Sequence, residues 1–220
     1  MSTFDFLGIT ISENLSWKPH TDKVANKLVK YLGILNRLKR YLPSHIMRIL
    51  YCSLVQSNLN YGILVWGHEC NRLHRLQKRF IRIISCSSYN AHTEPLFKKM
   101  ELLKLDDLFN INVFKFYYKF CHKTLPIYFN CFDLHTQSEI HSYRTRSQGN
   151  LSRTVSRTKL AQSFLRNVIP IKVNESPMYL TEKINTHSYK GFSDYVKQYY
   201  IKLYSNECNI DHCYICSGTR

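Results

Sequence analysis

Residues 71–86 read NRLHRLQKRFIRIISC, and this stretch decides the fold class of the chain. Its large apolar residues recur at spacings of three and four, at Leu73, Leu76, Phe80 and Ile83. This period places them on one face of an α-helix. The arginines repeat the same spacing one residue earlier, at Arg72, Arg75, Arg79 and Arg82. The stretch therefore predicts an amphipathic helix with an apolar stripe and an arginine stripe.

The arginine stripe has two interpretations. No acidic residue lies between Glu69 and Glu94, so the sequence supplies no carboxylate partner nearby. A guanidinium group binds phosphate through two parallel hydrogen bonds, and aligned arginines suit a row of phosphates. The alternative is a solvated basic face with no ligand.

The charge of the whole chain favours a polyanionic partner. Lysine and arginine number 31 against 15 acidic residues, which gives a net charge of +16. Nucleic acid is the leading expectation, followed by an anionic membrane surface and by a basic protein with no special partner. No long apolar run predicts a transmembrane helix, and residues 1–5 lack the features of a secretory signal. We therefore expect an intracellular protein with no membrane partner, in either the nucleus or the cytoplasm.

The rest of the chain predicts a mainly α fold with a short N-terminal β-hairpin. Residues 4–17 alternate like two strands, with residues 12–14 as the turn and Leu15 and Trp17 on the return strand. A long helix follows from Pro19, which suits a first helical turn. Its apolar stripe comprises Val24, Leu28, Tyr31, Leu32, Leu35 and Leu38. Its basic flank comprises Lys23, Lys27, Lys30 and Arg37.

Further helices are predicted over residues 43–55, 105–120, 160–168 and 189–204 from the same apolar period. Asn58 and Asn60 are expected to interrupt the first of these. The broad apolar face of 105–120 indicates that this helix packs into the core rather than forming an aromatic platform on which bases stack. Asp106 and Asp107 open that helix, where capping and dipole roles are expected instead of metal binding.

Four regions follow from this pattern. They are a hairpin over 1–18, a helical domain over 19–134, a basic extended linker over 135–159 and a small helical segment with a cysteine-rich tail over 160–220. The linker carries Arg144 and Arg146, and no acidic residue occurs from Ile140 to Asn174. Such a segment either contacts a nucleic-acid backbone or stays disordered.

The cysteines fall into two groups. The scattered ones, which lie among apolar residues, are expected to be buried, reduced thiols. They are Cys52, Cys70, Cys86, Cys121 and Cys131. The tail instead combines Cys208, His212, Cys213 and Cys216. Cys213 and Cys216 have the spacing of half a zinc site, to which Cys208 or His212 could add ligands, with free terminal thiols as the alternative.

The order of short motifs resembles the region after the catalytic palm in jockey- and CR1-type non-LTR retrotransposon reverse transcriptases. The motifs run through FLGI at 6–9, LSWKPH at 15–20, KYLGIL at 30–35, LYCSLV at 50–55, NYG at 60–62, WG at 66–67, LHRLQKR at 73–79, PLF at 95–97 and RTR at 144–146. Each motif is unspecific, and their shared order carries the resemblance. It weakens after about residue 167.

The resemblance implies roles for matching positions. Phe6, Leu7, Gly8 and Ile9 would correspond to the primer-grip hairpin, which holds the growing 3′ end. The helices from Pro19 to Cys86 would form the thumb, which grips an RNA or RNA/DNA template–primer. The implied partners are therefore that nucleic acid and the palm domain of the same polyprotein.

The sequence departs from the family pattern in its chemistry. The Tyr/Phe-x-Asp-Asp motif that should precede Phe6 is absent, so no palm carboxylates hold the Mg²⁺ ions of the complete polymerase. We expect a reverse-transcriptase fragment that binds nucleic acid, has no catalytic residues and is inactive alone. The alternative is a repurposed basic helical module that binds nucleic acid or protein, with zinc in its tail.

Overall fold

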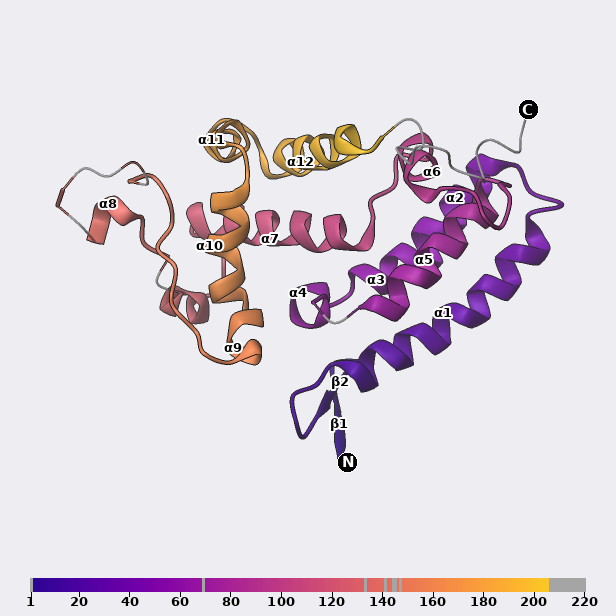
Figure 1. Ribbon diagram of the computed structural model, residues 1–220, viewed down its shortest axis with the longest axis horizontal. Coiled ribbons are helices and arrows are strands. Elements are labelled where there is room, and N and C mark those ends of the chain that lie inside the picture. Colours follow the sequence, from indigo (N-terminus) through magenta and orange to yellow (C-terminus); the bar gives the residue numbers. More distant parts are fainter. Residues whose placement is uncertain are drawn as a thin grey trace. The chain divides into compact units, whose positions relative to one another are not determined.

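The computed structural model describes residues 2–68, 70–132, 134–140, 142–143, 146 and 148–205. It is mainly helical, with a two-stranded antiparallel sheet at its start, which confirms the predicted fold class (Figure 1). The chain divides into two compact units: residues up to Leu108 together with those from Gln198 onward, and residues 109–197. Across the described ranges, no helix combines the length and apolar character that crossing a bilayer requires.

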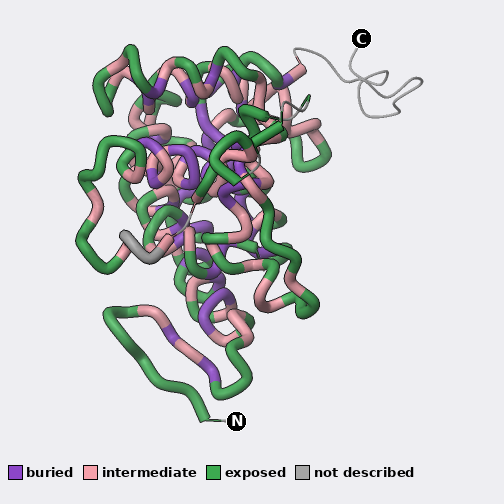
Figure 2. The backbone as a smooth tube through the Cα atoms, turned by 90° about the vertical axis from the view of Figure 1, so that its left-hand side faces the viewer, coloured by how far each residue is buried: buried purple, intermediate pink, exposed green. Residues whose placement is uncertain are grey.

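The hairpin is present, but its turn lies elsewhere than predicted. Strands β1 (Thr3–Phe6) and β2 (Ile9–Ser12) pair with Phe6 opposite Ile9. The turn is therefore Leu7–Gly8, with φ of 48° and 79°, and not residues 12–14. Two positive φ angles give the tight turn whose twist matches the strands, and glycine favours that conformation. Figure 2 shows β1 exposed throughout, while β2 alternates between half-buried and buried residues.

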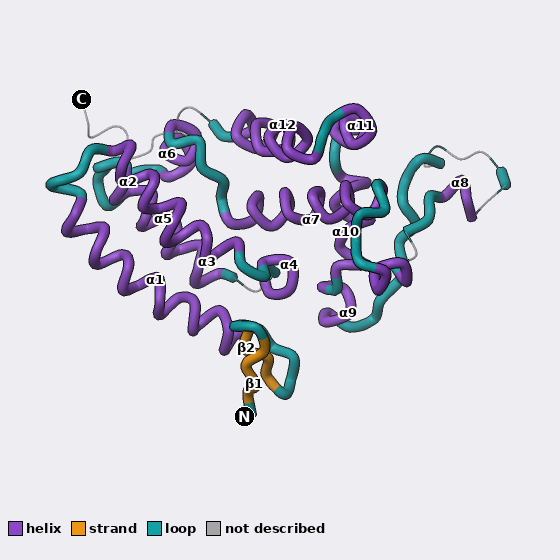
Figure 3. Tube along the Cα trace, turned by 180° about the vertical axis from the view of Figure 1, so that it is seen from behind, coloured by secondary structure: helices purple, strands orange, loops and turns teal. Residues whose placement is uncertain are grey.

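The first long helix, α1 (Lys18–Leu38), follows the predicted pattern, with Pro19 in its first turn. Ala25, Leu28, Leu32 and Leu35 are buried. This face packs along α5 (Asn71–Ile84), and Figures 1 and 3 show the two helices side by side. Leu15 and Trp17, predicted on a return strand, lie in the connection between β2 and α1.

A second long helix is continuous from Ser44 to Asn60. It comprises α2 (Ser44–Leu50), the π-helical segment η1 (Tyr51–Gln56) and α3 (Ser57–Asn60). The predicted interruption is wrong at Asn58, which lies inside the helix with its side-chain amide donating to the Leu54 carbonyl, whereas the helix does end at Asn60. Its fully buried residues are Met47, Tyr51, Val55 and Leu59, at a constant spacing of four. In a pure α-helix such a row drifts by about 40° per step, and the wider π turn reduces that drift.

The remaining elements of the first unit complete its core. Helix α4 (Ile63–Trp66) buries Trp66, whose indole donates to the Tyr61 carbonyl at 2.9 Å. Helix α5 buries Leu73, Leu76, Phe80 and Ile84, whereas the predicted core residue Ile83 is only half-buried. Helix α6 (Thr93–Lys99), which the sequence did not predict, buries Phe97.

The second unit contains most of α7 (Leu105–Cys121) and the start of α12 (Tyr189–Leu203). Tyr118 of α7 stacks on Phe192 of α12 at 5.2 Å and donates to the His187 carbonyl. Val113 and Phe114 are buried, which confirms core packing for this helix. The other elements are η2 (Ile127–Cys131), α8 (Gln137–Ile140), α9 (Lys159–Ser163), α10 (Leu165–Glu175) and α11 (Met178–Thr186).

The predicted extended linker over 135–159 is more structured than expected. It contains α8 and an isolated bridge between Thr136 and Leu151. The side chain of Asn174 bonds both backbone groups of Leu151, at 2.9 Å each. Asn174 on α10 therefore makes the two backbone hydrogen bonds that a further strand would make with Leu151. The predicted helix over 160–168 is broken at Phe164, where the backbone is extended.

Candidate nucleic-acid interface

The arginine stripe lies on the surface of α5, beside the face that packs into the core. Arg72, Arg75 and Arg79 are exposed and Arg82 is half-buried. The local cause is the helical period, because Arg72, Arg75 and Arg79 each precede a buried residue, and Arg82 precedes the half-buried Ile83. A Schellman motif ends the helix: Cys86 has φ 53°, and the Ser87 amide donates to the Arg82 carbonyl at 3.0 Å.

A groove of about 420 Å³ lies between α1 and α5. From α1 it is lined by Val29, Leu32, Gly33, Asn36 and Lys39. From α5 and the following loop it is lined by Arg79, Arg82, Ile83, Ser87 and Tyr89. Gly33 leaves open space, because a Cβ atom there would meet no heavy atom within 4 Å. A second hollow of about 570 Å³ continues the surface along Arg72, Arg75, Lys78 and Tyr89. We call these two hollows together the arginine groove.

The four arginines differ in their partners. Arg72 pairs with Asp22 at 2.7 Å and bonds the Asn26 amide oxygen at 3.0 Å, both on α1. The carboxylate partner of Arg72 thus comes from another helix and not from the neighbouring sequence, which has no acidic residue between Glu69 and Glu94. The Nε of Arg82 donates to the Ala91 carbonyl at 2.8 Å. Arg75 and Arg79 make no hydrogen bond or ion pair with any described residue, which leaves two guanidinium groups for a ligand.

Tyr89 adds an aromatic ring to the arginine groove. It is 77% exposed although it lines both hollows. An exposed ring beside free guanidinium groups suits base stacking next to phosphate contacts. The sequence signal was weak, because Tyr89 lies in a polar loop and only the turn at Cys86 directs that loop toward α1.

The predicted lysines lie on a different surface. Lys23 and Lys27 line a separate hollow of about 400 Å³ with Gly8, His20 and Tyr61. Lys23 also pairs with Asp5 at 2.8 Å, and both side chains are more than half exposed, so the pair is weak. Lys30 is exposed and lines neither surface. At 100° per residue, Lys27 lies roughly 160° around α1 from Val29, so the lysines do not extend the arginine groove.

The predicted primer-grip residues are brought near Lys23 and Lys27. Phe6 and Leu7 are exposed, and the Leu7 carbonyl accepts the Tyr61 hydroxyl at 2.5 Å. Gly8 lines the same hollow as the two lysines, and Ile9 packs against Gly62. Of the remaining predicted residues, Arg146 is exposed in the second unit. Outside the described residues lie Arg144, Cys208, His212, Cys213 and Cys216.

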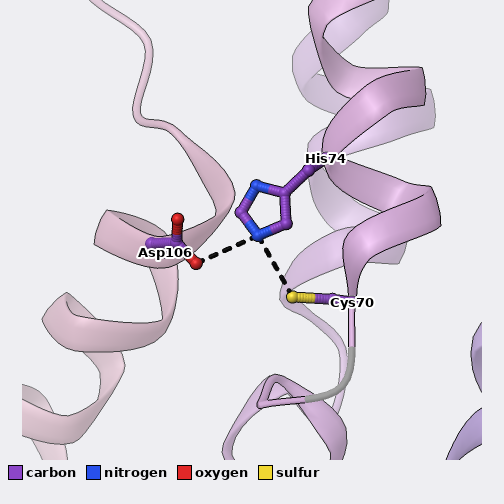
Figure 4. Close-up of side chains that lie close together, drawn as sticks. All are labelled: Cys70, His74 and Asp106. Atoms are coloured by element: carbon purple, nitrogen blue, oxygen red, sulfur yellow. Dashed lines mark hydrogen bonds and ion pairs between the residues drawn. The ribbon is translucent and has the colours of Figure 1, made fainter.

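A group that the sequence did not predict combines Cys70, His74 and Asp106 in the first unit (Figure 4). The Nε2 of His74 lies 3.0 Å from Asp106 Oδ1 and 3.3 Å from Cys70 Sγ. The Asp106 carboxylate and then the Cys70 thiol raise the pKa of His74 to about 9. Asp106 therefore contacts α5, beyond the capping and dipole role expected for it. These three residues could hold a metal ion.

The sequence alone could have brought together two of these three residues. Cys70 and His74 are four residues apart, which places them on one face at the start of α5. Cys70 is a buried free thiol, as predicted. The same expectation is wrong for Cys86 and Cys121, which are exposed because each lies at or near the end of a helix. Asp106 is distant in the sequence, and only the packing of α7 brings it to His74.

Comparison with known proteins gave no match to a family model, to a curated protein or to a solved structure.

Proposed function

We propose that the arginine groove binds the sugar–phosphate backbone of nucleic acid. The observation that carries this proposal is the pair Arg75 and Arg79, two exposed arginines without an ion pair among the described residues, in a groove that also presents Tyr89. An exposed arginine gains at most about 1 kcal/mol from a nearby carboxylate, and no carboxylate in the described part of the chain pairs with these two. A phosphate diester supplies the missing acceptor, and the net charge of +16 attracts it over a longer range.

The groove favours phosphate contacts over base reading. Its polar side chains are mostly basic, and a guanidinium group grips phosphate oxygens whatever the base. One ring, Tyr89, offers stacking, which every base accepts. We therefore expect binding with little sequence preference and with a strong dependence on salt.

The decisive experiment measures the affinity of the full chain for a short RNA/DNA hybrid across a series of salt concentrations. The variant Arg75→Gln/Arg79→Gln should bind about tenfold or more weakly, and its salt slope should be shallower by about 1–2. The matched control is Lys190→Gln/Lys202→Gln, which removes the same charge at two exposed positions that do not line the arginine groove. If both variants lost the same affinity, the loss would come from the lower net charge alone, and the proposal of a specific binding groove would be contradicted.

We further propose that the chain is the thumb-like part of a non-LTR retrotransposon reverse transcriptase. The ordered motifs from FLGI at 6–9 to RTR at 144–146 support this origin, as does the succession of hairpin, long helix and basic helix. Because the chain contains no Tyr/Phe-x-Asp-Asp motif, we propose that it binds template–primer without extending it. Primer extension with Mg²⁺ and deoxynucleotides tests the activity. The genomic sequence upstream of the Met1 codon tests the origin, since palm motifs should be encoded there.

The tail enters the proposal separately. Cys208, Cys213 and Cys216, with His212, offer sulfur and nitrogen donors of the kind that Zn²⁺ selects. Zinc content of the purified chain, compared with that of Cys213→Ser, tests this assignment. If Cys213→Ser leaves the zinc content unchanged, the proposal that the tail binds zinc is contradicted.

A further inference from the structure

We propose that Cys70, His74 and Asp106 bind a zinc ion at the junction of α5 and α7. This site is independent of the proposed nucleic-acid binding, because none of its residues lines the arginine groove. Two of the donors come from the start of α5, and the third comes from the first turn of α7. All three lie in the first unit of the chain.

The three donor atoms lie close together. The Nε2 of His74, the Sγ of Cys70 and a carboxylate oxygen of Asp106 all lie within 4.8 Å of one another. Zn–N and Zn–S bonds of about 2.0 and 2.3 Å at tetrahedral angles separate nitrogen from sulfur by about 3.5 Å, and nitrogen from oxygen by about 3.3 Å. The corresponding separations here are 3.3 and 3.0 Å. An ion therefore requires the nitrogen to part from the sulfur and from the oxygen by only a few tenths of an ångström, and it requires the sulfur and the oxygen, now within 4.8 Å, to lie about 3.5 Å apart.

The chemistry of the donors selects the metal. A thiolate and an imidazole together favour Zn²⁺ over Mg²⁺ or Ca²⁺, which prefer oxygen. Binding requires the Nε2 of His74 to lose its proton. It also requires the Cys70 thiol to release its proton and its bond to the Gly67 carbonyl, now 3.1 Å long. The side chain of Asp106 is 72% exposed, so a water molecule can reach the fourth coordination position. The ion would join the start of α7 to the start of α5.

The same geometry argues against a cysteine nucleophile. A catalytic imidazole takes the thiol proton at one nitrogen while a third group orients it through the other. In Figure 4 both dashed lines, to Cys70 and to Asp106, leave the same nitrogen of His74. Here the Nε2 of His74 faces both Cys70 Sγ and Asp106 Oδ1. A metal ion bound by all three atoms could take the place of the proton on that nitrogen.

The test uses Co²⁺ as a spectroscopic substitute for Zn²⁺ in the full chain. The tail is first silenced by Cys208→Ser/Cys213→Ser/Cys216→Ser, so that any remaining signal belongs to the proposed site. After chelator treatment, Co²⁺ titration should give one equivalent with a thiolate charge-transfer band and the visible bands of tetrahedral cobalt, and Zn²⁺ should abolish both. Adding Cys70→Ser should remove the thiolate band.

Two further variants keep the outcome decisive. Asp106→Asn is an exposed change that should lower Zn²⁺ affinity at least about tenfold, since even outer-shell changes have effects of that size. Cys86→Ser removes an exposed thiol outside the site and should leave cobalt binding unchanged. Circular dichroism confirms that each variant is folded. The proposal is overturned if the tail-silenced chain shows no thiolate–cobalt band, or if the band survives Cys70→Ser.

Discussion

The side-chain oxygen of Gln77 accepts the backbone N–H of Leu105 at 2.9 Å. Gln77 is 2% exposed, and its amide nitrogen donates to the Leu103 carbonyl and to the Tyr51 hydroxyl, each at 3.0 Å. One buried side-chain amide on α5 therefore supplies hydrogen-bond partners for the backbone groups of Leu103 and Leu105 at the start of α7. The same contact brings Asp106 next to His74.

Replacing Gln77 by methionine should destabilise the fold by about 2–5 kcal/mol, because the Leu105 N–H and the Leu103 carbonyl would be buried without partners. Urea unfolding measures the loss. Lys78→Met, at the adjacent exposed position, is the control and should change stability by less than about 0.5 kcal/mol. Similar stabilities for the two variants would show that water replaces the amide.

Filling the arginine groove at Gly33 should separate binding from folding. Gly33→Leu places an isobutyl group in open space within α1, where leucine also has the higher helix propensity, by about 0.5–1 kcal/mol. We expect thermal stability to be kept or raised and affinity for an RNA/DNA hybrid to fall. Gly33→Ala gains similar helix propensity with little volume, so its affinity should stay close to that of the wild type. Wild-type affinity in Gly33→Leu would place the ligand elsewhere.

Cys86→Gly should stabilise the chain by about 1 kcal/mol, because glycine adopts the left-handed conformation at the end of α5 without a steric cost. Cys86 is exposed, so little packing is lost. Cys86→Ala keeps the unfavourable φ and should bring no gain. Chemical denaturation of the two variants gives the comparison, and equal stability would mean that the turn carries no strain.

The stability of the fold should fall on acidification because of His20. This side chain is 3% exposed, its Nδ1 accepts the Thr10 N–H, and its ring lies 5.6 Å from Trp66. Burial, followed by the charge of Lys23, lowers the pKa of His20 below its ordinary value of 6.5, and Asp5 opposes this shift. The unfolded chain therefore binds the proton more readily. The contribution of His20 is complete above about pH 6.5 and is lost as the pH falls through the lowered pKa of the folded state.

The variant His20→Asn isolates this effect, because its amide oxygen can accept the same bond from Thr10 but does not titrate. Its unfolding free energy should depend less on pH below 6.5 than that of the wild type. The Lys23 bond lowers the pKa of Asp5, whose own contribution is lost only below the ordinary carboxylate value of 3.8. The two windows are thus distinct, and parallel pH profiles for variant and wild type would rule out His20 as the titrating group.

The sequence predicted best what depends on local periodicity. Helices α1, α5 and α7 follow from their apolar spacing, and the arginine stripe follows from the same period one residue earlier. Contacts between segments that are distant in the sequence produce no periodic pattern. The pairing of Arg72 with Asp22 and the approach of Tyr89 to α1 depend on how helices pack, and no period encodes that. Asp106 looked like a helix-capping residue because its partner, His74, belongs to another helix.

The Leu7–Gly8 turn was missed for a different reason. Leu7, Ile9 and Ile11 alternate with small or polar residues, so the period-two pattern of a strand continues through Gly8. The polar residues 12–14 offered a second plausible turn. Strand pairing decides between the two, since it requires Phe6 to face Ile9.

The π-helical segment Tyr51–Gln56 is the place where this helix can lose a residue without losing its buried face. A π turn holds about one residue more than an α turn, so deleting one residue there would restore ordinary helical winding and leave the residues beyond it on nearly the same face. Leu59 would then still share a face with Met47, so lineages of this chain should tolerate a one-residue gap within 51–56 more readily than a gap elsewhere in the helix.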